Sequence, residues 1–217
     1  SVGAIKWLAV FRCQAMIMQD TSKRWFIMRR IIIAITGASG VIYGIRALEL
    51  LRSVKDVETH AIITPSAFRT ALAEVDHTAD EIRSLADHIY NHKDIGATIS
   101  SGSFHTSGML VAPCSIKTLS AIANCYNGEL TARAADVCLK ERRRVVLMLR
   151  ETPFHAGHIR LMDQVTQNGA IVMPPVPAFY SRPQTLDDIV NQSVGRALDL
   201  FDIQLPVVKR WTGSGVD

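Results

Sequence analysis

The sequence predicts an α/β fold of the flavodoxin or Rossmann type, in which helices cover both faces of a doubly wound parallel sheet to give three layers. Runs such as Ile31–Thr36 and Val145–Leu149 are almost wholly apolar, which is typical of parallel strands buried on both faces. These runs alternate with stretches of helical periodicity. The first run leads directly into the glycine-rich turn Gly37–Gly40, a usual junction between the first strand and the first helix of such a fold.

The remaining elements follow the same alternation, with Pro, Gly and Ser residues between them. The expected strands are Ile31–Thr36, Glu58–Thr64, Gly108–Ala112, Val145–Leu149 and Ala170–Met173. The expected helices are Val41–Ser53, Ala67–Glu74, Thr78–His92, Ile116–Asn124, Leu130–Glu141, Pro153–Asn168 and Leu186–Leu200. The Ser- and Gly-rich stretch Asp94–His105 is expected to form an irregular loop at the active site.

Length and composition indicate one globular domain. The chain has 217 residues, of which 48% are hydrophobic and 20% are charged, and no apolar run is long enough to cross a bilayer. We expect the domain to span residues 30–211, with a tail at 212–217 and an N-terminal extension at 1–29 outside the fold. The extension is basic and poor in acids, as a transit peptide would be, but an upstream extension or a misassigned start is the preferred interpretation.

The formal net charge of +4 does not indicate a nucleic-acid-binding surface. Residues 1–30 contain six Lys and Arg and one acid, so 18 basic and 19 acidic residues remain in 31–217. A nucleic-acid-binding domain should carry the basic excess itself. The four cysteines form no CxxC pair, which favours a reducing compartment. The sequence therefore predicts a cytoplasmic protein, or a mitochondrial one if the extension is a transit peptide, that binds neither nucleic acid nor membrane.

Two polar turns at strand ends are candidate phosphate sites. Gly37–Gly40 and Ser115–Thr118 each follow a predicted strand and open a helix, where free backbone N–H groups and the helix dipole attract anions. Helix capping or a plain tight turn would explain each of them taken alone. Because both turns are expected at the carboxyl edge of one sheet, a shared ligand is the stronger interpretation. The dinucleotide fingerprint GxGxxG is not met.

A basic side chain is expected beside these turns. Arg150, followed by Glu151, comes directly after a predicted strand, so its guanidinium can reach the same crevice and bind phosphate with two hydrogen bonds. The run Arg142–Arg144 is expected to be a solvated helix end. Cys114 lacks the partner base that would make it a nucleophile. Two histidine pairs that are close in sequence lack a full set of metal ligands, namely His88 with His92 and His155 with His158.

Four longer segments resemble the UbiX/Pad-type flavin prenyltransferases, within the wider flavoprotein superfamily of flavodoxin-like cysteine decarboxylases. They are ITGASGVIYGIRALELL, ATISSGSFHTSGMLVAPCSIKTLSAIA, LTARAADVCLKERRRVVLMLRETP and VMPPVPAFYSRPQTLDDIV. They keep the order and spacing of the family between Arg30 and Trp211. The resemblance implies transfer of a dimethylallyl group from dimethylallyl phosphate to N5 and C6 of reduced FMN. It further implies a homododecamer that requires no metal, and a UbiD-type decarboxylase that receives the prenylated FMN.

The resemblance also assigns roles to individual residues. FMN contacts are implied for Gly37, Ala38, Ser39, Thr64, Ser115, Ile116, Lys117, Thr118 and Arg133. A clamp for the prenyl phosphate is implied for Lys140, Arg150, Tyr180 and Arg196, with Trp211 closing the site. The implied catalytic residues, which assist proton movement at the flavin, are Ser39 and Glu151. Such a clamp suits the chemistry, because a phosphate leaves readily only when its charge is neutralised.

Two departures from the family and two alternative functions remain. Thr64-Pro65-Ser66 replaces the more usual Ser-Lys-Ala, and Leu149 stands where many relatives have Pro. An FMN-dependent decarboxylase of the same superfamily would need no prenyl-phosphate clamp. A non-catalytic flavin carrier could dispense with both the clamp and Glu151. The presence of the clamp residues and of Glu151 favours the prenyltransferase over both alternatives.

Overall fold

A six-stranded sheet organises residues 28–213, which the computed structural model describes. All neighbouring strands are parallel and lie in the order β3-β2-β1-β4-β5-β6, so the predicted doubly wound sheet is confirmed. The strands are β1 (Arg29–Ile35), β2 (Val57–Ile63), β3 (His88–Tyr90), β4 (Gly108–Cys114), β5 (Arg144–Leu149) and β6 (Ile171–Val172). Residues 1–27 of the predicted extension and 214–217 of the predicted tail lie outside the described residues.

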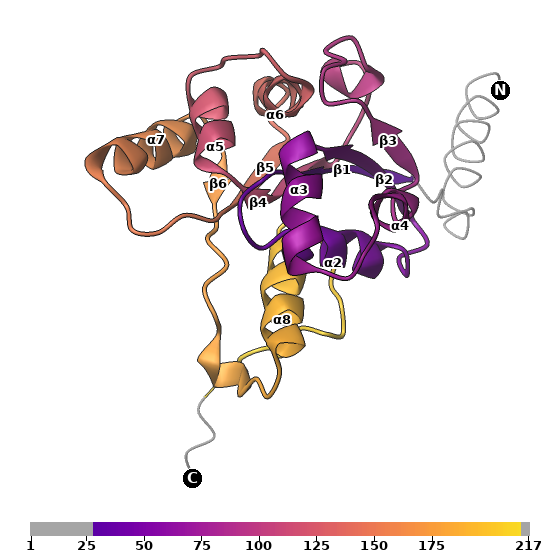
Figure 1. The fold of residues 1–217 in the computed structure, drawn as a ribbon, viewed down its shortest axis with the longest axis vertical. Coiled ribbons are helices and arrows are strands. Elements are labelled where there is room, and N and C mark those ends of the chain that lie inside the picture. Colours follow the sequence, from indigo (N-terminus) through magenta and orange to yellow (C-terminus); the bar gives the residue numbers. More distant parts are fainter. Residues whose placement is uncertain (1–27, 214–217) are drawn as a thin grey trace, which may run out of the picture.

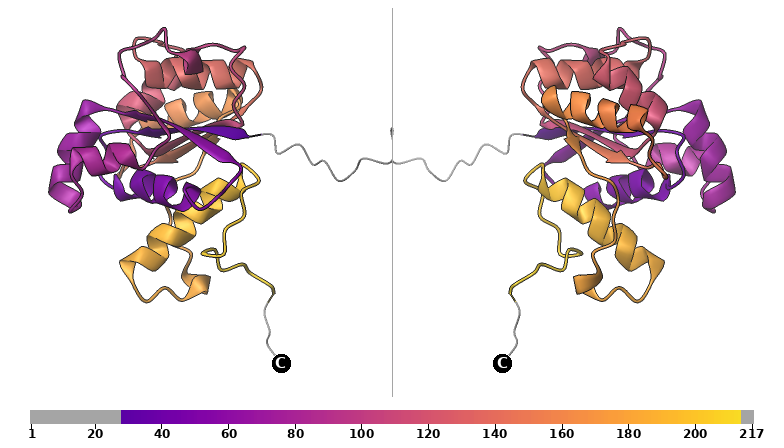
Figure 2. Two further views of the ribbon diagram at one scale, coloured as in Figure 1. Left: turned by 90° about the vertical axis from the view of Figure 1, so that its right-hand side faces the viewer. Right: turned by 90° about the vertical axis from the view of Figure 1, so that its left-hand side faces the viewer.

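Helices cover both faces of this sheet, which gives the expected three layers (Figures 1 and 2). They are α2 (Ile42–Leu51), α3 (Pro65–Glu74), α4 (Ala79–Ser84), α5 (Ile116–Ala123), α6 (Leu130–Lys140), α7 (Ala156–Gln167) and α8 (Leu186–Asp199). Two 3-10 turns accompany them, η1 (Thr98–Ser100) and η2 (Phe179–Ser181). One layer contains α2 packed against α8, and the opposite layer contains α5 packed against α6 and α7.

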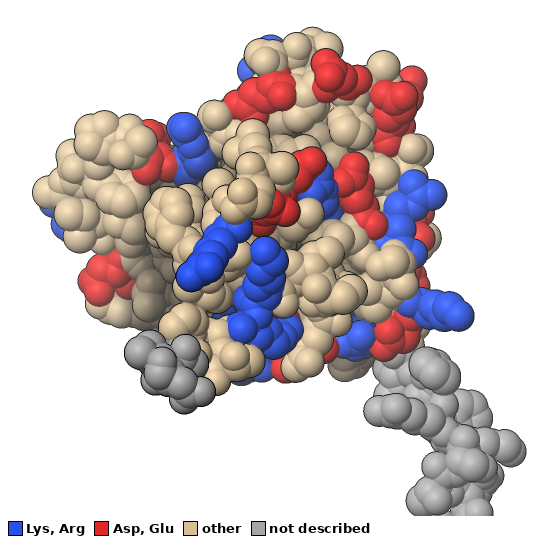
Figure 3. Space-filling view, turned by 90° about the horizontal axis from the view of Figure 1, so that it is seen from below, with Lys and Arg blue, Asp and Glu red and all other residues tan. Residues whose placement is uncertain are grey.

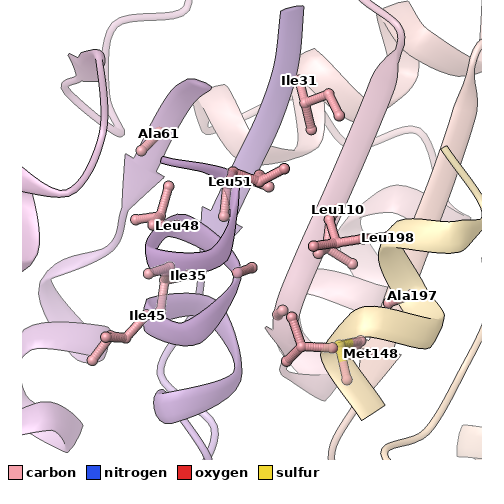
Figure 4. Close-up of a cluster of buried hydrophobic side chains, with 14 of the residues drawn as sticks. Ile31, Ile35, Ile45, Leu48, Leu51, Ala61, Leu110, Met148, Ala197 and Leu198 are labelled. Atoms are coloured by element: carbon pink, nitrogen blue, oxygen red, sulfur yellow. The ribbon is translucent and has the colours of Figure 1, made fainter. Parts of the chain in front are cut away.

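Each face of the sheet has its own buried core, and β1 contributes to both. Ile31, Ile33 and Ile35 pack in the core beneath α2 and α8 (Figure 4), whereas Ile32 and Ala34 pack in the core beneath α5 and α6. None of these five residues is more than 1% exposed. A strand buried on both sides needs an apolar residue at every position, which is why this segment is one continuous apolar run. Truncating one of its isoleucines to Ala would cost about 2–5 kcal/mol.

The helix predicted over Thr78–His92 is wrong in its second half. The helix α4 ends at Ser84, and His88–Tyr90 instead form the edge strand β3 beside β2. Asp87 accounts for the change, because its carboxylate accepts hydrogen bonds from the backbone N–H and the hydroxyl of Thr59, both at 2.8 Å. The Thr59 hydroxyl accepts in turn from the Asp87 N–H at 3.0 Å. These contacts with β2 hold the segment extended, although its apolar spacing suits a helix.

The surface agrees with the near balance of charge expected for the domain. On the face shown in Figure 3, Lys and Arg side chains are interspersed with Asp and Glu and do not form one broad basic area. Arg46, for example, donates to both Glu49 and Asp187, at 2.8 and 2.9 Å. Within residues 28–213, none of the helices has the length and apolar character needed to span a membrane.

Candidate functional site

The candidate site lies where the strand order reverses, between β1 and β4. In a doubly wound sheet the ends of the strands part at this point and leave a crevice at their carboxyl edge. Thr36 ties the two sides together, because its hydroxyl donates to the Pro113 carbonyl at 2.6 Å and accepts from the Ser115 N–H at 3.0 Å. The two turns that the sequence singled out are therefore neighbours.

The glycine-rich turn after β1 packs tightly against the start of α3. A Cβ placed on Gly37 would lie 2.4 Å from the Cβ of Ser66, a distance that real side chains do not adopt. Thr70 strengthens the contact by donating to the Gly37 carbonyl at 3.1 Å. Gly40 has φ of +94°, a conformation that residues with side chains rarely adopt. Glycine is thus required at both ends of this turn.

Glu74 also holds this turn in place, a role that was not predicted from the sequence. Its Oε2 atom accepts hydrogen bonds from the backbone N–H groups of Gly40 at 2.7 Å and Val41 at 3.2 Å. These N–H groups belong to the start of α2, where a carboxylate is favoured by the helix dipole. Glu74 lies 34 positions away at the end of α3, so no local pattern in the sequence indicates the contact.

Predicted site residues form the whole lining of a hollow of about 330 Å³ at this edge. They come from three separate segments: the turn after β1, the start of α5 and the end of β5. The lining residues are Gly37, Ala38, Ser39, Ser115, Ile116, Lys117, Arg150 and Glu151. The structure therefore brings both implied catalytic residues and one clamp arginine next to most of the implied FMN contacts.

A second hollow of about 320 Å³ shares Ser115 and Lys117 with the first. The other predicted FMN residues that line it are Thr64 and Thr118. Two of these residues cap the helices that begin here. The Thr64 hydroxyl accepts from the Ala67 N–H at 3.2 Å at the start of α3, and the Ser115 hydroxyl accepts from the Thr118 N–H at 3.3 Å at the start of α5. Five further polar or charged residues of this lining were not predicted as site residues; they are Thr36, Ser66, Arg69, His92 and Glu129.

Arg69 is notable among these residues because of its position on α3. The resemblance implies a lysine where this chain has Pro65, so that cation is absent here. Arg69 lies four residues further along, within the second turn of the helix, and lines the same hollow. It supplies a positive charge on this side of the crevice. The sequence offers one hint of this role: Arg69 is about one helical turn after Pro65, so both residues lie on the same side of α3.

The residues present fit a flavin mononucleotide. Helices α2, α3 and α5 all begin at this edge, and helix N-termini offer N–H donors and a favourable dipole to a phosphate. Arg69 adds positive charge, and Lys117 lines the same hollow while paired with Glu129 at 2.8 Å. In an adjoining hollow of about 290 Å³, also lined by Lys117 and Thr118, the buried Thr131 hydroxyl has no hydrogen-bond partner among the described residues. A bound ligand with oxygen acceptors would satisfy it.

Three residues implied for the prenyl-phosphate clamp lie together away from the crevice hollows: Tyr180, Arg196 and Trp211. Tyr180 and Arg196 line a separate hollow of about 160 Å³ beside the segment Met173–Ala178. The rings of Tyr180 and Trp211 meet edge to face, with centroids 5.9 Å apart. Tyr180 is 47% exposed and Trp211 is 64% exposed.

Asp199 holds the Arg196 side chain in this region. Its carboxylate pairs with both Arg196 and Arg210. Burial raises the pKa of Asp199, but the hydrogen bonds from Arg210 and Arg196 outweigh it and leave that pKa below its usual value. Asp199 therefore stays ionised and keeps both guanidinium groups oriented.

Two further predicted residues lie on α6, outside the linings of the two crevice hollows. Arg133 donates to Asp136 at 3.2 Å within the same helix. Lys140, at the far end of α6, pairs with Glu141 beside Gly102. The start of α6 lies beside Lys117 and Thr118, and α6 ends just before β5 begins, so Lys140 lies at the opposite end of the sheet from Arg150, which follows the end of β5. The residues implied for the clamp are therefore not gathered in one place within a single chain.

Cys114 is not an available nucleophile. The residue is fully buried at the end of β4, and burial raises the pKa of its thiol to about 12. At neutral pH the thiol therefore stays protonated, and thiols react as thiolates. This agrees with the low weight that the sequence gave to Cys114.

Comparisons with known proteins place this geometry in a family. The flavoprotein family model matches residues 21–198. A flavin prenyltransferase UbiX from Thauera aromatica is 56% identical over 185 residues, covering 85% of this chain and 95% of the relative. A crystal structure of a UbiX (PadA1) in complex with FMN and dimethylallyl pyrophosphate is 48% identical, with a TM-score of 0.83, and covers 85% of this chain and 98% of that one.

A second solved structure gives the same result. It is a dodecameric FMN-dependent UbiX-like decarboxylase from Escherichia coli O157:H7, 44% identical with a TM-score of 0.83, and the match covers 85% of this chain and 100% of that one. The chain therefore belongs to the flavoprotein family and, within it, to the UbiX-type flavin prenyltransferases.

Proposed function

We propose that this chain is a flavin prenyltransferase that transfers a dimethylallyl group from dimethylallyl phosphate to N5 and C6 of reduced FMN. The observation that carries the proposal is the hollow that gathers the glycine turn, Ser115–Lys117 and the pair Arg150–Glu151 at one sheet edge. A relative that is 56% identical is named for this activity. A solved relative holds FMN together with dimethylallyl pyrophosphate.

The chain contributes binding, charge and proton transfer, while bound FMN supplies the ring atoms that are alkylated. Arg150 projects from the end of β5 into the hollow, where its guanidinium can offset the charge of the leaving phosphate. Glu151 lines the same hollow and can hold a proton at Oε2, because its Oε1 already accepts from the Thr152 N–H at 3.0 Å. The Ser39 hydroxyl, in the same lining, can relay that proton.

The remaining clamp residues are proposed to reach the crevice from other copies of the chain. Tyr180, Arg196 and Trp211 are at least partly exposed, and Lys140 lies at the other end of α6. A homo-oligomer, and specifically a homododecamer as in one solved relative, would bring surfaces of different copies together. Residues 30–211 are the proposed functional domain of each copy, with residues 1–29 as an extension to it.

The proposed product is prenylated FMN, which a UbiD-type decarboxylase would receive in ubiquinone biosynthesis or in aromatic acid decarboxylation. The proposed compartment is the cytoplasm. The chain itself indicates no choice between the two pathways. Co-expression with a decarboxylase of this type, followed by an assay of its activity with and without this chain, tests the partnership directly.

The proposed reaction is tested by mixing the purified protein anaerobically with reduced FMN and either dimethylallyl phosphate or the diphosphate. Mass spectrometry of the extracted flavin should show the gain of one C5 unit. The gain should disappear in Glu151→Gln and in Arg196→Ala. An unmodified flavin with every donor, despite tight FMN binding, would contradict the proposal and favour the FMN-dependent decarboxylase or the flavin carrier.

A further inference from the structure

A cluster of two histidines and a glutamate lies on the edge of the sheet, outside the flavin crevice. Glu58 and His60 are two positions apart on β2 and therefore point to the same face. His88 on β3 is the direct partner of His60 across the strand pair. In the part of the chain that the structure describes, these three residues are the one group whose side-chain nitrogen and oxygen atoms could hold a metal ion, with all ligand atoms within 4.8 Å of one another.

The imidazole rings of His60 and His88 both approach the same carboxylate oxygen of Glu58. The Nε2 atom of His60 lies 2.9 Å from Oε1 of Glu58, and the Nε2 atom of His88 lies 3.1 Å from the same atom. The rings stack with centroids 4.7 Å apart. Ligand atoms of a tetrahedral zinc site, each about 2.0–2.2 Å from the metal, are separated by slightly more than these distances. Small side-chain rotations would therefore be sufficient to place all three around one ion.

His60 provides an independent observation. The residue is 2% exposed, and its Nε2 atom is buried without a hydrogen bond, since the nearby Glu58 oxygen meets the distance but not the geometry of one. An unpartnered polar atom in this position is costly, so it calls for an explanation. Glu58 and His88 are more exposed, with side-chain exposures of 24% and 52%, so the cluster is open to solvent on one side. An ion could enter from there.

The other nitrogen of His60 has the support that metal-bound histidines usually have. Its Nδ1 atom lies 2.9 Å from the Tyr90 hydroxyl, which lies 3.0 Å from the Thr98 hydroxyl. If Nδ1 donates in this chain of hydrogen bonds, the lone pair of Nε2 faces Glu58 and is free for a metal.

The charges around the cluster are compatible with a cation. Arg30 opposes one, because its Nε lies 3.6 Å from Oε1 of Glu58 and its guanidinium stacks over Phe104. Glu58 is the acid of the cluster itself. Asp87, next to His88, is bound to Thr59 on the opposite face of the sheet. Glu58 and Arg30 balance each other in charge, so an ion here would be held by direct coordination and not by an excess of negative charge.

We propose that Glu58, His60 and His88 bind one divalent transition-metal ion of the zinc class, with water completing its coordination. Two imidazoles and one carboxylate are a common donor set for zinc, and the donors leave positions open. The ion would join the short edge strand β3 to β2. Since β3 leads into His92, which lines the flavin crevice, the ion would also fix the start of the loop that borders the site. It has a structural role and takes no part in prenyl transfer.

The proposal is tested with the full-length protein, stripped of metal with a chelator and titrated with Zn²⁺ against a chromogenic chelator. The wild type should bind one ion per chain. His88→Ala removes a half-exposed ligand and should weaken binding at least about 10-fold, as loss of even an outer-shell partner commonly does. His105→Ala is the matched control, because this exposed histidine lies outside the cluster, and it should bind as the wild type does.

Two further readouts do not depend on enzyme activity. Bound Co²⁺ should give a visible absorption spectrum in the wild type and in His105→Ala but not in His88→Ala. Saturating Zn²⁺ should raise Tm in the same two proteins only. Glu58→Gln serves as a second ligand variant if His88→Ala does not fold. Absence of stoichiometric Zn²⁺ binding by the wild type would overturn the proposal, and so would equal affinity in the wild type and in both ligand variants.

Discussion

The flavin crevice and the residues proposed as a prenyl-phosphate clamp are built in different ways. Every residue lining the first hollow of the crevice comes from a turn or strand end at one sheet edge, within a few positions of β1, β4 or β5. The clamp residues beyond Arg150 come from the far end of α6, from η2 and from α8. A parallel sheet aligns its own strand ends automatically, but it does not bring distant helix ends together. Most residues implied for FMN therefore meet within one chain, whereas the residues implied for the clamp do not.

The largest expected effect is at the crevice. Glu151→Gln removes the carboxylate that can take up a proton but keeps the size of the side chain. Prenyl transfer should fall by about 10²–10⁴-fold, the usual contribution of a general acid or base, while FMN binding is retained. Single-turnover formation of prenylated FMN and FMN titration measure the two quantities separately. Full activity of this variant would remove Glu151 from the proposed mechanism.

The second prediction concerns the clamp, where Asp199 offers a matched pair of variants. Arg196→Ala and Arg210→Ala each remove one guanidinium from the same carboxylate. If Arg196 grips the prenyl phosphate, its loss should reduce the rate by about 10²–10³-fold, whereas loss of Arg210 should change it little. Equal losses in the two variants would indicate that both arginines act only through Asp199.

Mixing variants would sharpen the comparison between the two regions. Arg150→Ala alters the crevice, and Arg196→Ala alters the clamp. If the two act in one site but come from different copies, co-assembled oligomers of the two variants should regain part of the activity that each lacks alone. Activity of the mixture should be assayed after co-refolding or co-expression. If activity does not return although the oligomer forms, each copy contains its own clamp.

A smaller effect is expected when the glycine turn is overfilled. Gly37→Ala would place its Cβ 2.4 Å from that of Ser66, so the turn or α3 must shift. We expect a loss of about 1–3 kcal/mol of stability, seen as a lower Tm, together with weaker FMN binding. Ser66→Gly removes the clashing atom, so the double variant should recover much of the loss. If Gly37→Ala behaves as the wild type, the close contact is not important for the turn.

The smallest effect is expected from thiol modification. Burial raises the pKa of Cys114 to about 12 and that of Cys138 to about 11, above their ordinary value near 9, so at pH 8 almost no thiolate is present at either residue. Cys125 is exposed. A thiol reagent at pH 8 should modify Cys125 while Cys114, Cys138 and prenyl transfer are unaffected, as peptide mass spectrometry and the flavin assay would reveal. Rapid labelling of Cys114 would contradict its burial.

The crevice was largely predictable because its signals are local. An apolar strand followed by glycines, or by Ser115 and Thr118, is visible in consecutive residues, and parallel strands must end at the same edge. The contribution of Glu74 to the same turn was not predictable, since it depends on how the end of α3 packs against α2. That Arg69 lines the crevice could be predicted only once the position of α3 was known.

The sequence by itself determined the doubly wound sheet, the two polar turns and the place of Arg150 and Glu151, because periodicity and strand-turn-helix junctions are properties of neighbouring residues. Only the tertiary structure decided that His88 lies on an edge strand beside His60, and that Lys140 and Arg196 lie apart from Arg150. Such contacts join residues that are remote in the chain. They depend on which surfaces pack together, as where pairing with β2 and the Asp87–Thr59 hydrogen bonds hold an extended segment in place of the predicted helix.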